Sequence, residues 1–182
     1  MKTQRRWALL VLVALLCIAL AGCGTGQDAQ TPVAQKEVKP PTAEEAMQAL
    51  QQQFPEAIEK VVIYDEQSDP NGLLGRPGQY IGKADFIDSR IEMNKNPYLT
   101  DEMKEGGTLE CFENGSACDS RYEELCRLSG PDMGAFGVNA YIYKYDQAIF
   151  RVSYDVTPSD AAAYQIAMDA ILGEASIAYE GE

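Results

Sequence analysis

An apolar run near the N-terminus divides this chain into a targeting segment and a folding segment. Residues 7–20 form fourteen positions without a charge, and Lys2, Arg5 and Arg6 precede them. A membrane-spanning helix needs roughly 20 apolar residues. A span would have to borrow residues 21–26, which are rich in glycine. A basic start, an apolar middle and small residues before a cut are typical of a secretory signal peptide. We therefore expect the fold to be built from later residues.

Cys23 follows this run in the sequence Leu20-Ala21-Gly22-Cys23. The pattern resembles the lipobox of bacterial lipoproteins, in which a peptidase cuts before the cysteine and the thiol receives a diacylglycerol. The resemblance implies that residues 1–22 are a lipoprotein signal peptide and that Cys23 is the lipid attachment site. Two or more acyl chains, such as palmitate, hold a protein firmly on a bilayer. The expected location is the extracytoplasmic face of the cell membrane.

The charge and the composition exclude several classes of function. The net charge is −13, and removal of residues 1–22, which hold three cations and no anions, takes it to −16. Phosphate backbones are bound by clustered Lys and Arg, so we expect no nucleic-acid partner and membrane contact only through the N-terminal lipid. The chain contains no histidine. This excludes Ser-His-Asp and Cys-His catalytic arrangements and histidine metal sites.

The remaining chain is predicted to be a tether followed by one domain. Residues 23–41 are rich in Gln, Thr, Ala and Pro and lack an apolar period, which is typical of a flexible linker. Residues 42–182 form the predicted single domain. Three helix starts stand out: a capping box at Thr42, a start at Ser116, and Thr157 followed by Pro158.

Apolar and β-branched segments between these helices predict five strands. They cover residues 58–64, 80–91, 107–112, 136–145 and 148–156, and the last two form a hairpin that turns near residues 146–147. In the last segment Phe150 and Val152 alternate with Arg151 and Ser153, which predicts one wet face. The fold class is therefore α+β, with an antiparallel sheet of about five strands and two to three helices packed on one face.

Residues 69–80 are the most distinctive internal segment. Three glycines and two prolines within these twelve positions predict a long, shaped loop between two strands. As a binding loop it would present Arg76, Tyr80 and Lys83 to a ligand or partner, with Arg76 able to bind a carboxylate or phosphate in bidentate fashion. The structural alternative, which we favour, is that Arg76 ties the loop to Asp65, Asp69 or a carbonyl.

This segment also carries a family resemblance. Its elements are Asp69-Pro70-Asn71, Leu73-Leu74-Gly75-Arg76-Pro77 and Tyr80-x-x-Lys83. They resemble a signature of uncharacterised surface lipoproteins and secreted domains of Gram-positive bacteria. Residues 107–112, the final hairpin and residues 157–164 resemble the rest of that module, so the resemblance covers most of residues 58–172. It implies a surface setting and no particular activity.

Two short segments partly match the sequence patterns of known ligand sites, an EF-hand calcium loop and a phosphate-binding P-loop, but lack essential residues of each. An EF-hand loop starting at Gln67 would place Asp69 correctly, but its first ligand would be an amide and its twelfth position is Gly78. An Asx-type turn explains this stretch better. Residues 78–84 lack the glycine spacing and the Ser or Thr of a P-loop. We expect no metal and no cofactor.

The three later cysteines allow limited pairing. Cys118 and Cys126 lie eight positions apart on one predicted helix, about 12 Å along its axis, which exceeds the roughly 7 Å that a disulfide spans. Any bridge must therefore use Cys111. We predict a Cys111–Cys126 disulfide, with Cys111–Cys118 and three free thiols as alternatives. Both Cys111 and Cys126 stand where the resembling module has ordinary apolar residues.

The most economical hypothesis is a non-enzymatic binding or interaction module at the cell surface. Its partner would be an envelope protein, a cell-wall component or a small-molecule ligand. The expected contact surfaces are the loop of residues 69–80 and the row formed by Tyr141, Tyr143 and Tyr145, although such a row more often packs under helices. Two alternatives stay open. One is a small cell-wall hydrolase that uses carboxylates alone, and the other is an inhibitor of a wall-degrading enzyme.

Overall fold

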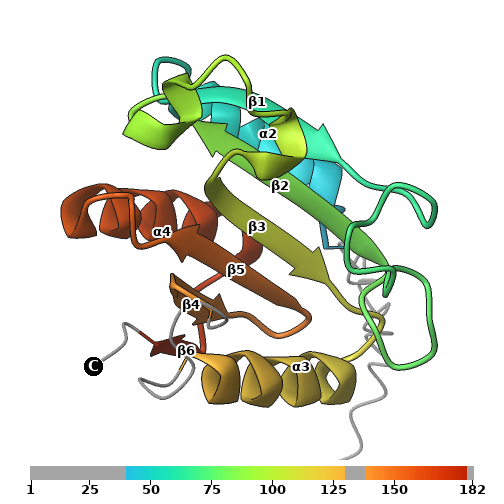
Figure 1. Cartoon of the computed structure of the whole chain (residues 1–182). Coiled ribbons are helices and arrows are strands. Elements are labelled where there is room, and N and C mark those ends of the chain that lie inside the picture. Colours follow the sequence, from blue (N-terminus) through green and yellow to red (C-terminus); the bar gives the residue numbers. More distant parts are fainter. Residues whose placement is uncertain (1–39, 130–137, 180–182) are drawn as a thin grey trace, which may run out of the picture. The chain divides into compact units, whose positions relative to one another are not determined.

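The computed structural model describes residues 40–129 and 138–179. The predicted signal peptide, the lipid site at Cys23 and the tether up to residue 39 lie outside the described residues. The described elements follow one another in the order α-β-β-β-α-β-β-α-β (Figure 1). The α-helices are α2 (Ala43–Gln53), α3 (Gly115–Leu128) and α4 (Pro158–Leu172). Two short 3-10 helices, η1 (Glu92–Lys95) and η2 (Asp101–Met103), lie between the second and third strands.

The strands form one antiparallel sheet. They are β1 (Ile58–Ile63), β2 (Gly82–Asp88), β3 (Gly106–Cys111), β4 (Ala140–Lys144), β5 (Ala148–Ser153) and β6 (Ile177–Tyr179). Their spatial order is β1-β2-β3-β5-β4-β6, and each neighbouring pair is antiparallel. The predicted α+β class is confirmed. The sheet has one strand more than expected, because β6 is only three residues long and too short for an alternation to be recognised.

The helix starts are set by local side-chain caps. At α2, Thr42 accepts from the Glu45 backbone N–H at 3.2 Å and donates its own N–H to the Glu45 side chain at 2.8 Å, which confirms the capping box. Thr157 caps α4, as predicted. The prediction for α3 was two residues late. Asn114 is its cap, and its Oδ1 accepts from the Ala117 N–H at 3.0 Å. Asn is among the strongest N-cap residues.

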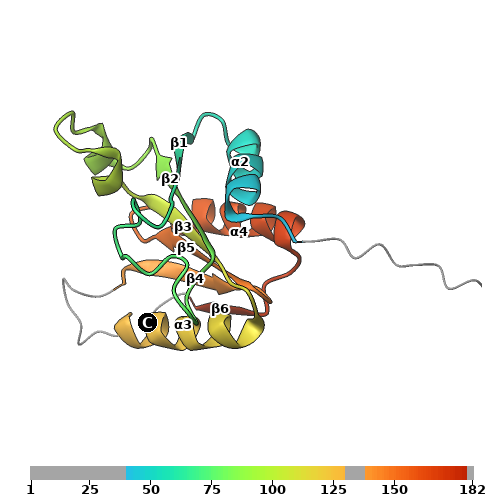
Figure 2. The same ribbon diagram turned by 90° about the vertical axis from the view of Figure 1, so that its right-hand side faces the viewer.

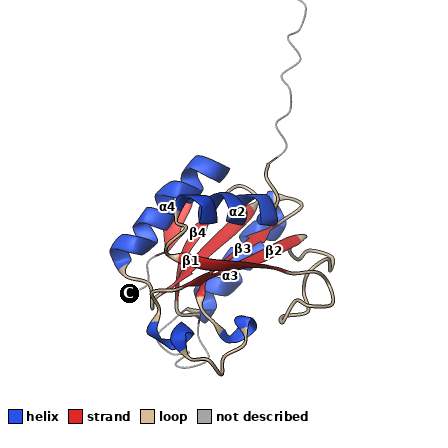
Figure 3. Cartoon of the chain, turned by 90° about the horizontal axis from the view of Figure 1, so that it is seen from above, coloured by secondary structure: helices blue, strands red, loops and turns tan. Residues whose placement is uncertain are grey.

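Two helices pack on one face of the sheet, as predicted, and the third covers the opposite face, which was not predicted. Helices α2 and α4 lie on one side, and α3 lies on the other (Figures 2 and 3). The buried residues accordingly form two clusters. One joins α2 and α4 to the sheet, and the other joins α3 and the loop after β1 to the opposite face. The covering of the second face depends on where α3 docks, which no local pattern reveals.

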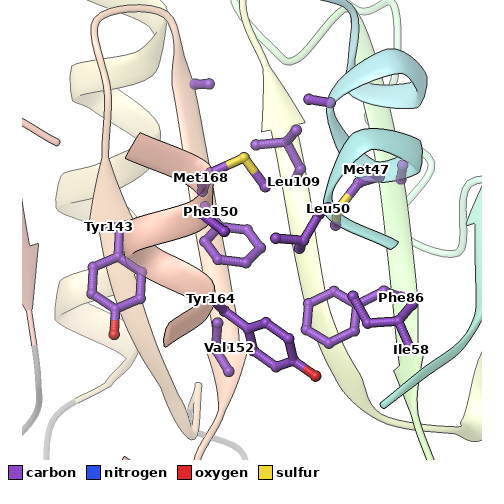
Figure 4. Packing of buried hydrophobic residues seen from close by; sticks show 14 of the residues in the cluster. Met47, Leu50, Ile58, Phe86, Leu109, Tyr143, Phe150, Val152, Tyr164 and Met168 are labelled. Atoms are coloured by element: carbon purple, nitrogen blue, oxygen red, sulfur yellow. The ribbon is translucent and has the colours of Figure 1, made fainter. Parts of the chain in front are cut away.

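The larger cluster is built on packed aromatic rings (Figure 4). The Phe86 ring lies 6.2 Å from the Phe150 ring and 5.0 Å from the Tyr164 ring. Phe150 in turn stacks on Tyr143 at 6.1 Å. Such aromatic pairs contribute roughly 0.5–1.5 kcal/mol beyond the burial of their area. Because Tyr164 comes from α4 and Phe86 from β2, this contact joins the last helix to the first half of the sheet.

Strand β5 is covered on both sides, which corrects the prediction of one wet face. Phe150 and Val152 point into the larger cluster, while Ile149 is fully buried in the cluster under α3. Arg151 shares the α3 side and forms an ion pair with the buried Glu110 of β3. The charged residue in the alternation therefore marks a buried ion pair and not a solvent-exposed face.

Strand β2 ends at Asp88, three residues before the predicted end. Asp88 is fully buried and receives two hydrogen bonds from the Arg90 guanidinium, at 2.9 and 2.6 Å. The Tyr164 hydroxyl donates to the same carboxylate at 2.7 Å. Burial alone would raise the pKa of Asp88, but the hydrogen bonds from Arg90 and Tyr164 outweigh it and the pKa is lowered. This cluster fastens the end of β2 to α4.

Candidate functional site

The loop between β1 and β2 is organised by a buried carboxylate. Asp69 has no exposed side-chain surface. It accepts a hydrogen bond from the Tyr80 hydroxyl at 2.7 Å and one from Lys83 Nζ at 3.0 Å. The backbone N–H groups of Leu73 and Leu74 donate to it at 2.8 and 3.1 Å. The Asp69 side chain is thus bonded to both the first and the second half of the loop and holds the two halves together.

The electrostatics of this carboxylate favour its charged form. Burial would raise the pKa of Asp69, but the hydrogen bonds from Tyr80, Leu73 and Lys83 together outweigh it, and the pKa lies well below its usual range. The same contact acts on its partner: burial, followed by the hydrogen bond to Asp69, raises the pKa of Tyr80. At neutral pH the pair is therefore a carboxylate and a neutral phenol.

Lys83 is held in the same cluster. Its side chain is almost fully buried, and its ammonium lies 4.6 Å from the centroid of the Tyr64 ring. The Tyr64 hydroxyl donates to Asp85 at 2.9 Å. Lys83 therefore has an anion and an aromatic face as neighbours inside the protein, an arrangement that stabilises a buried cation.

The two halves of the loop are closed by turns. Asp65 accepts from the N–H of Ser68 at 2.8 Å and from the N–H of Gln67 at 3.1 Å, which is the predicted Asx-type turn. Gly75 has a φ of +77°, and a Cβ at this position would lie 2.6 Å from Glu66 Oε1. The left-handed backbone requires glycine here, whereas the contact is with the end of an exposed glutamate side chain that can move aside. The loop is thereby pre-shaped by local signals as well as by Asp69.

The structure separates the three residues predicted to bind a ligand. Tyr80 and Lys83 meet inside the loop on Asp69, whereas Arg76 is exposed at its outer turn. Arg76 forms no ion pair with any residue in the described ranges. The alternative that a charged side chain holds the loop in place was therefore correct, but that side chain is Asp69 and not Arg76. From the sequence, Asp69 was expected to be a partner of Arg76 or part of a turn that resembles a calcium loop. The Asp-Pro-Asn-Gly turn was the available signal.

A second buried charge cluster lies beside the first, under α3. Glu110 of β3 is fully buried and stands opposite Lys83 in the register of the sheet. Arg121 of α3 donates to it through Nε and Nη2 at 3.0 and 3.1 Å, and Arg151 of β5 donates through Nη2 at 3.1 Å. Arg121 also binds Glu124 at 2.8 Å. This cluster was not predictable from the sequence, since its members come from three elements.

Two buried side-chain atoms lack a hydrogen-bond partner within the described residues, Asp85 Oδ1 and Arg151 Nε. Thr108 lies between their residues in the sheet register. Neither atom has exposed surface, so neither presents a group to a ligand. The polar clusters on this face are internal. Within the residues that the structure describes, no group of acidic and cysteine side chains is arranged to hold a metal ion.

The predicted disulfide is absent. Cys111, Cys118 and Cys126 are all free. Cys111 packs on the α2 side of the sheet, whereas Cys126 packs on the α3 side. The sheet lies between the two thiols, so the prediction that paired them across one sheet–helix contact was wrong about the face. Burial raises the pKa of both Cys111 and Cys118 to about 12.

The tyrosine row predicted as a contact surface is mainly core. Tyr143 and Tyr145 are buried in the larger cluster, and Tyr141 packs against it. The Tyr145 hydroxyl donates to Asp169 of α4 at 2.9 Å. Of the two interpretations considered, packing under a helix is the one that the structure supports.

An exposed apolar surface lies at the other end of β2, in residues 89–105. Met93, Tyr98 and Met103 are all exposed there, Tyr98 to 90%. The segment is ordered by Asn94, whose side chain donates to the Asp88 carbonyl at 2.8 Å and accepts from the Glu105 N–H at 2.8 Å. We call residues 89–105 the β2–β3 excursion. This exposed segment was not predicted from the sequence, because its apolar residues follow no period.

Comparison with known proteins supplies no assignment. No family model, no curated protein sequence and no solved structure matches this chain. Among the described residues, no helix is long and apolar enough to cross a membrane.

Proposed function

We propose that this protein is a lipid-anchored, extracytoplasmic binding module without catalytic activity, and that the loop of residues 64–81 presents its contact surface. The observation that carries the proposal is the division of charges between this loop and the start of β2, where Lys83 lies. The buried charges of Asp69 and Lys83 neutralise each other, while Arg76 stands exposed on a backbone that these residues fix. A pre-shaped loop binds with less loss of conformational entropy than a flexible one.

The chemistry of Arg76 indicates the kind of group that is bound. A guanidinium binds carboxylate or phosphate through two parallel hydrogen bonds. The chain as a whole is acidic, with a net charge of −13, so a polyanion would be repelled. The proposed ligand therefore offers a single anionic group on a neutral or cationic body, such as an acidic side chain of an envelope protein. The apolar β2–β3 excursion is a second surface suited to a protein partner, since Met and Tyr are favoured at interfaces.

The carboxylates argue against the alternative of an acid-only hydrolase. Such an enzyme needs two carboxyl groups about 5–10 Å apart that face a substrate, one of which carries a proton. The buried acids Asp69, Asp88 and Glu110 are each held by Lys or Arg. The pKa values of Asp69 and Asp88 are lowered, by hydrogen bonds that outweigh their burial. Neither therefore holds a proton to donate at neutral pH.

The binding surface is tested by photo-cross-linking on intact cells. A photoreactive residue replaces Gly78, where a side chain has open space although the backbone has a φ of +75°. We expect Arg76→Ala to abolish the cross-linked product and to leave the melting temperature unchanged, because the side chain is exposed. Arg127→Ala is the matched control, since Arg127 is an exposed arginine on α3. Undiminished cross-linking by Arg76→Ala would refute the role of the loop.

The lipid anchor and the lack of catalysis have separate tests. Cells given an alkyne-tagged fatty acid should label the wild-type chain and should not label Cys23→Ser. Label retained in Cys23→Ser, or a purified chain that still begins at Met1, would contradict the anchor. Turnover of cell-wall glycans at any pH would contradict a pure binding role, and stoichiometric loss of a wall hydrolase's activity would favour the inhibitor alternative.

A further inference from the structure

Helix α3 and the loop of residues 64–81 cover the same face of the sheet and share one buried cluster. The loop contributes Tyr64, Leu74 and Tyr80, and α3 contributes Cys118 and Leu125. The Tyr80 ring lies 6.3 Å from the ring of Phe112, which follows β3 directly. Helices α2 and α4 lie on the other side of the sheet (Figure 3). Apolar packing therefore joins the loop to α3 and not to the other two helices.

A chain of buried charges makes the same connection. Lys83 of β2 donates to Asp69 of the loop at 3.0 Å, and Glu110 of β3 stands directly opposite Lys83 in the sheet register. Opposite charges in such a cross-strand pair attract each other. Arg121 of α3 donates two hydrogen bonds to Glu110, at 3.0 and 3.1 Å. The four charges therefore alternate in sign from the loop, across two strands, to the helix.

The two buried side-chain atoms without a hydrogen-bond partner in the described residues belong to this network. Asp85, whose Oδ1 is one of them, accepts a hydrogen bond from Tyr64 at the start of the loop, at 2.9 Å. Arg151, whose Nε is the other, donates to Glu110 at 3.1 Å. A buried polar atom left unpaired costs free energy, which is recovered when water reaches the atom. Both costs fall on this face of the sheet and favour its opening.

We infer that the loop of residues 64–81 and α3 open as one unit, with Glu110 as their shared anchor, while α2 and α4 stay closed on the opposite face. Domains open locally in contiguous cooperative units, whose opening free energy lies below that of global unfolding. Withdrawal of α3 takes Arg121 from Glu110, and withdrawal of the loop takes Asp69 from Lys83. Either step also exposes the shared apolar cluster to water, so the second withdrawal costs less free energy after the first.

The joint opening has a consequence for the loop as a contact surface, and this consequence rests on the proposed function. Arg76 is held in position only while the loop is closed, so opening removes the surface that would bind an anionic group. A contact that stabilises α3 on the sheet therefore strengthens binding at the loop, and a ligand on the loop strengthens that contact by the same factor. Exposed residues of α3, such as Asp119 and Glu123, are accessible to such a contact.

Hydrogen exchange of the full chain, followed by NMR without any ligand, tests the joint opening. The reporters are the backbone N–H groups of Leu73 and Leu74, which are bonded to Asp69, and those of α3. Arg121→Gln should speed exchange in the loop at least about tenfold, because breaking a buried ion pair on one side is strongly destabilising. This is expected although the hydrogen bonds of Arg121 go to Glu110 and Glu124. Asp69→Asn should in turn speed exchange in α3 by a similar factor.

Tyr164→Phe is the control on the opposite face, because it removes the hydrogen bond from α4 to Asp88. It should leave exchange in the loop and in α3 unchanged. Arg121→Lys keeps the charge but loses the paired hydrogen bonds, and it replaces Arg121→Gln if that variant does not fold. Faster exchange in α3 alone after either substitution of Arg121 would overturn the inference, and so would faster exchange in the loop and α3 of Tyr164→Phe. Neither outcome depends on whether Arg76→Ala abolishes cross-linking, which tests the proposed function separately.

Discussion

Asp69 accepts hydrogen bonds from both halves of the loop between β1 and β2. The residues next to it in the sequence predicted only a turn. The dense Gly and Pro signals were sufficient to locate the loop. The residues that saturate the carboxylate, Tyr80 and Lys83, are 11 and 14 positions away. Their convergence depends on how the loop returns to β2. Residues that far apart show no periodic pattern in the sequence. The contacts that Asp69 makes with Tyr80 and Lys83 could therefore be recognised only in the structure.

Replacing Asp69 should therefore destabilise the fold. Asp69→Asn removes the charge that neutralises Lys83 and leaves a buried ammonium without its anion. Breaking a buried ion pair on one side costs about 3–5 kcal/mol. We expect a fall in the free energy of unfolding of about 3 kcal/mol, measured by denaturant titration. The double variant Asp69→Asn with Lys83→Met should recover part of this loss, because it removes the unpaired charge.

Asp65→Asn is the matched control for this experiment. It makes the same substitution in the same loop, at an exposed carboxylate that serves only a local turn. Its expected effect is below about 0.5 kcal/mol, as for most surface substitutions. Equal losses for Asp65→Asn and Asp69→Asn would show that Asp69 does not organise the loop.

The thiols offer a second test at the same scale. Burial raises the pKa of Cys111 and Cys118 to about 12, and only the thiolate reacts readily with alkylating agents. At pH 8 we expect both residues to be modified by iodoacetamide far more slowly in the folded chain than in denaturant. Mass spectrometry of the peptides gives the rates. A disulfide at either cysteine, or equal rates in both states, would contradict the free, buried thiols.

Helix boundaries were predictable where a cap and a stop stand in the local sequence. Thr42 and Thr157 gave α2 and α4 their first residues because both caps are local interactions. The start of α3 was misplaced because Asn114 and Ser116 are both good caps, and the sequence does not choose between them. The face that each helix covers was not predictable at all, since it depends on the path of the chain between elements.

A pair of substitutions distinguishes the two candidate caps of α3. The Asn114 side chain accepts from a backbone N–H in the first turn. Asn114→Ala should therefore lower the free energy of unfolding by about 1 kcal/mol, as typical for loss of an N-cap. Ser116→Ala removes no cap and should cost less than about 0.5 kcal/mol. If Ser116→Ala lowered the free energy of unfolding more than Asn114→Ala, in thermal or denaturant unfolding, Ser116 would be the cap, as expected from the sequence.

The two faces of the sheet differ in character across the whole domain. The face under α2 and α4 is an apolar and aromatic core, which the alternating strands predicted. The face under α3 combines apolar residues with two buried charge clusters, centred on Asp69 and Glu110. In the sequence these charges looked like solvent-exposed positions, because charged residues usually are exposed. Burial of several charged groups makes the stability of the molecule depend on pH at both extremes.

The acid side of this dependence follows from the lowered pKa values of Asp69 and Asp88, where hydrogen bonds outweigh burial. A carboxyl group whose pKa is lower in the folded than in the unfolded chain stabilises the fold at any pH above its unfolded pKa, near 3.8. This stabilisation is lost as the pH falls from there toward the pKa of the folded state. We expect the free energy of unfolding to decline below about pH 4. In Asp69→Asn this decline should be shallower, and an unchanged slope would contradict the assignment.

The alkaline side follows from three buried phenols, Tyr80, Tyr145 and Tyr164. Burial, followed by the hydrogen bond that each hydroxyl donates to an Asp, raises all three pKa values above the usual 10.0. The stability that they contribute is fully present below pH 10 and is lost as the pH rises toward the folded values, because the unfolded chain releases these protons first. The three phenols should therefore ionise only as the domain unfolds.

Absorbance near 295 nm measures this ionisation directly, because tyrosinate absorbs there and tyrosine does not. Tyr80, Tyr145 and Tyr164 should titrate in one step that coincides with the loss of far-ultraviolet circular dichroism. Tyr164→Phe removes one phenol and leaves the ring in the core, so it should reduce the amplitude of that step. Ionisation of these three phenols before any secondary structure is lost would contradict the raised pKa values of the buried hydroxyl–carboxylate pairs.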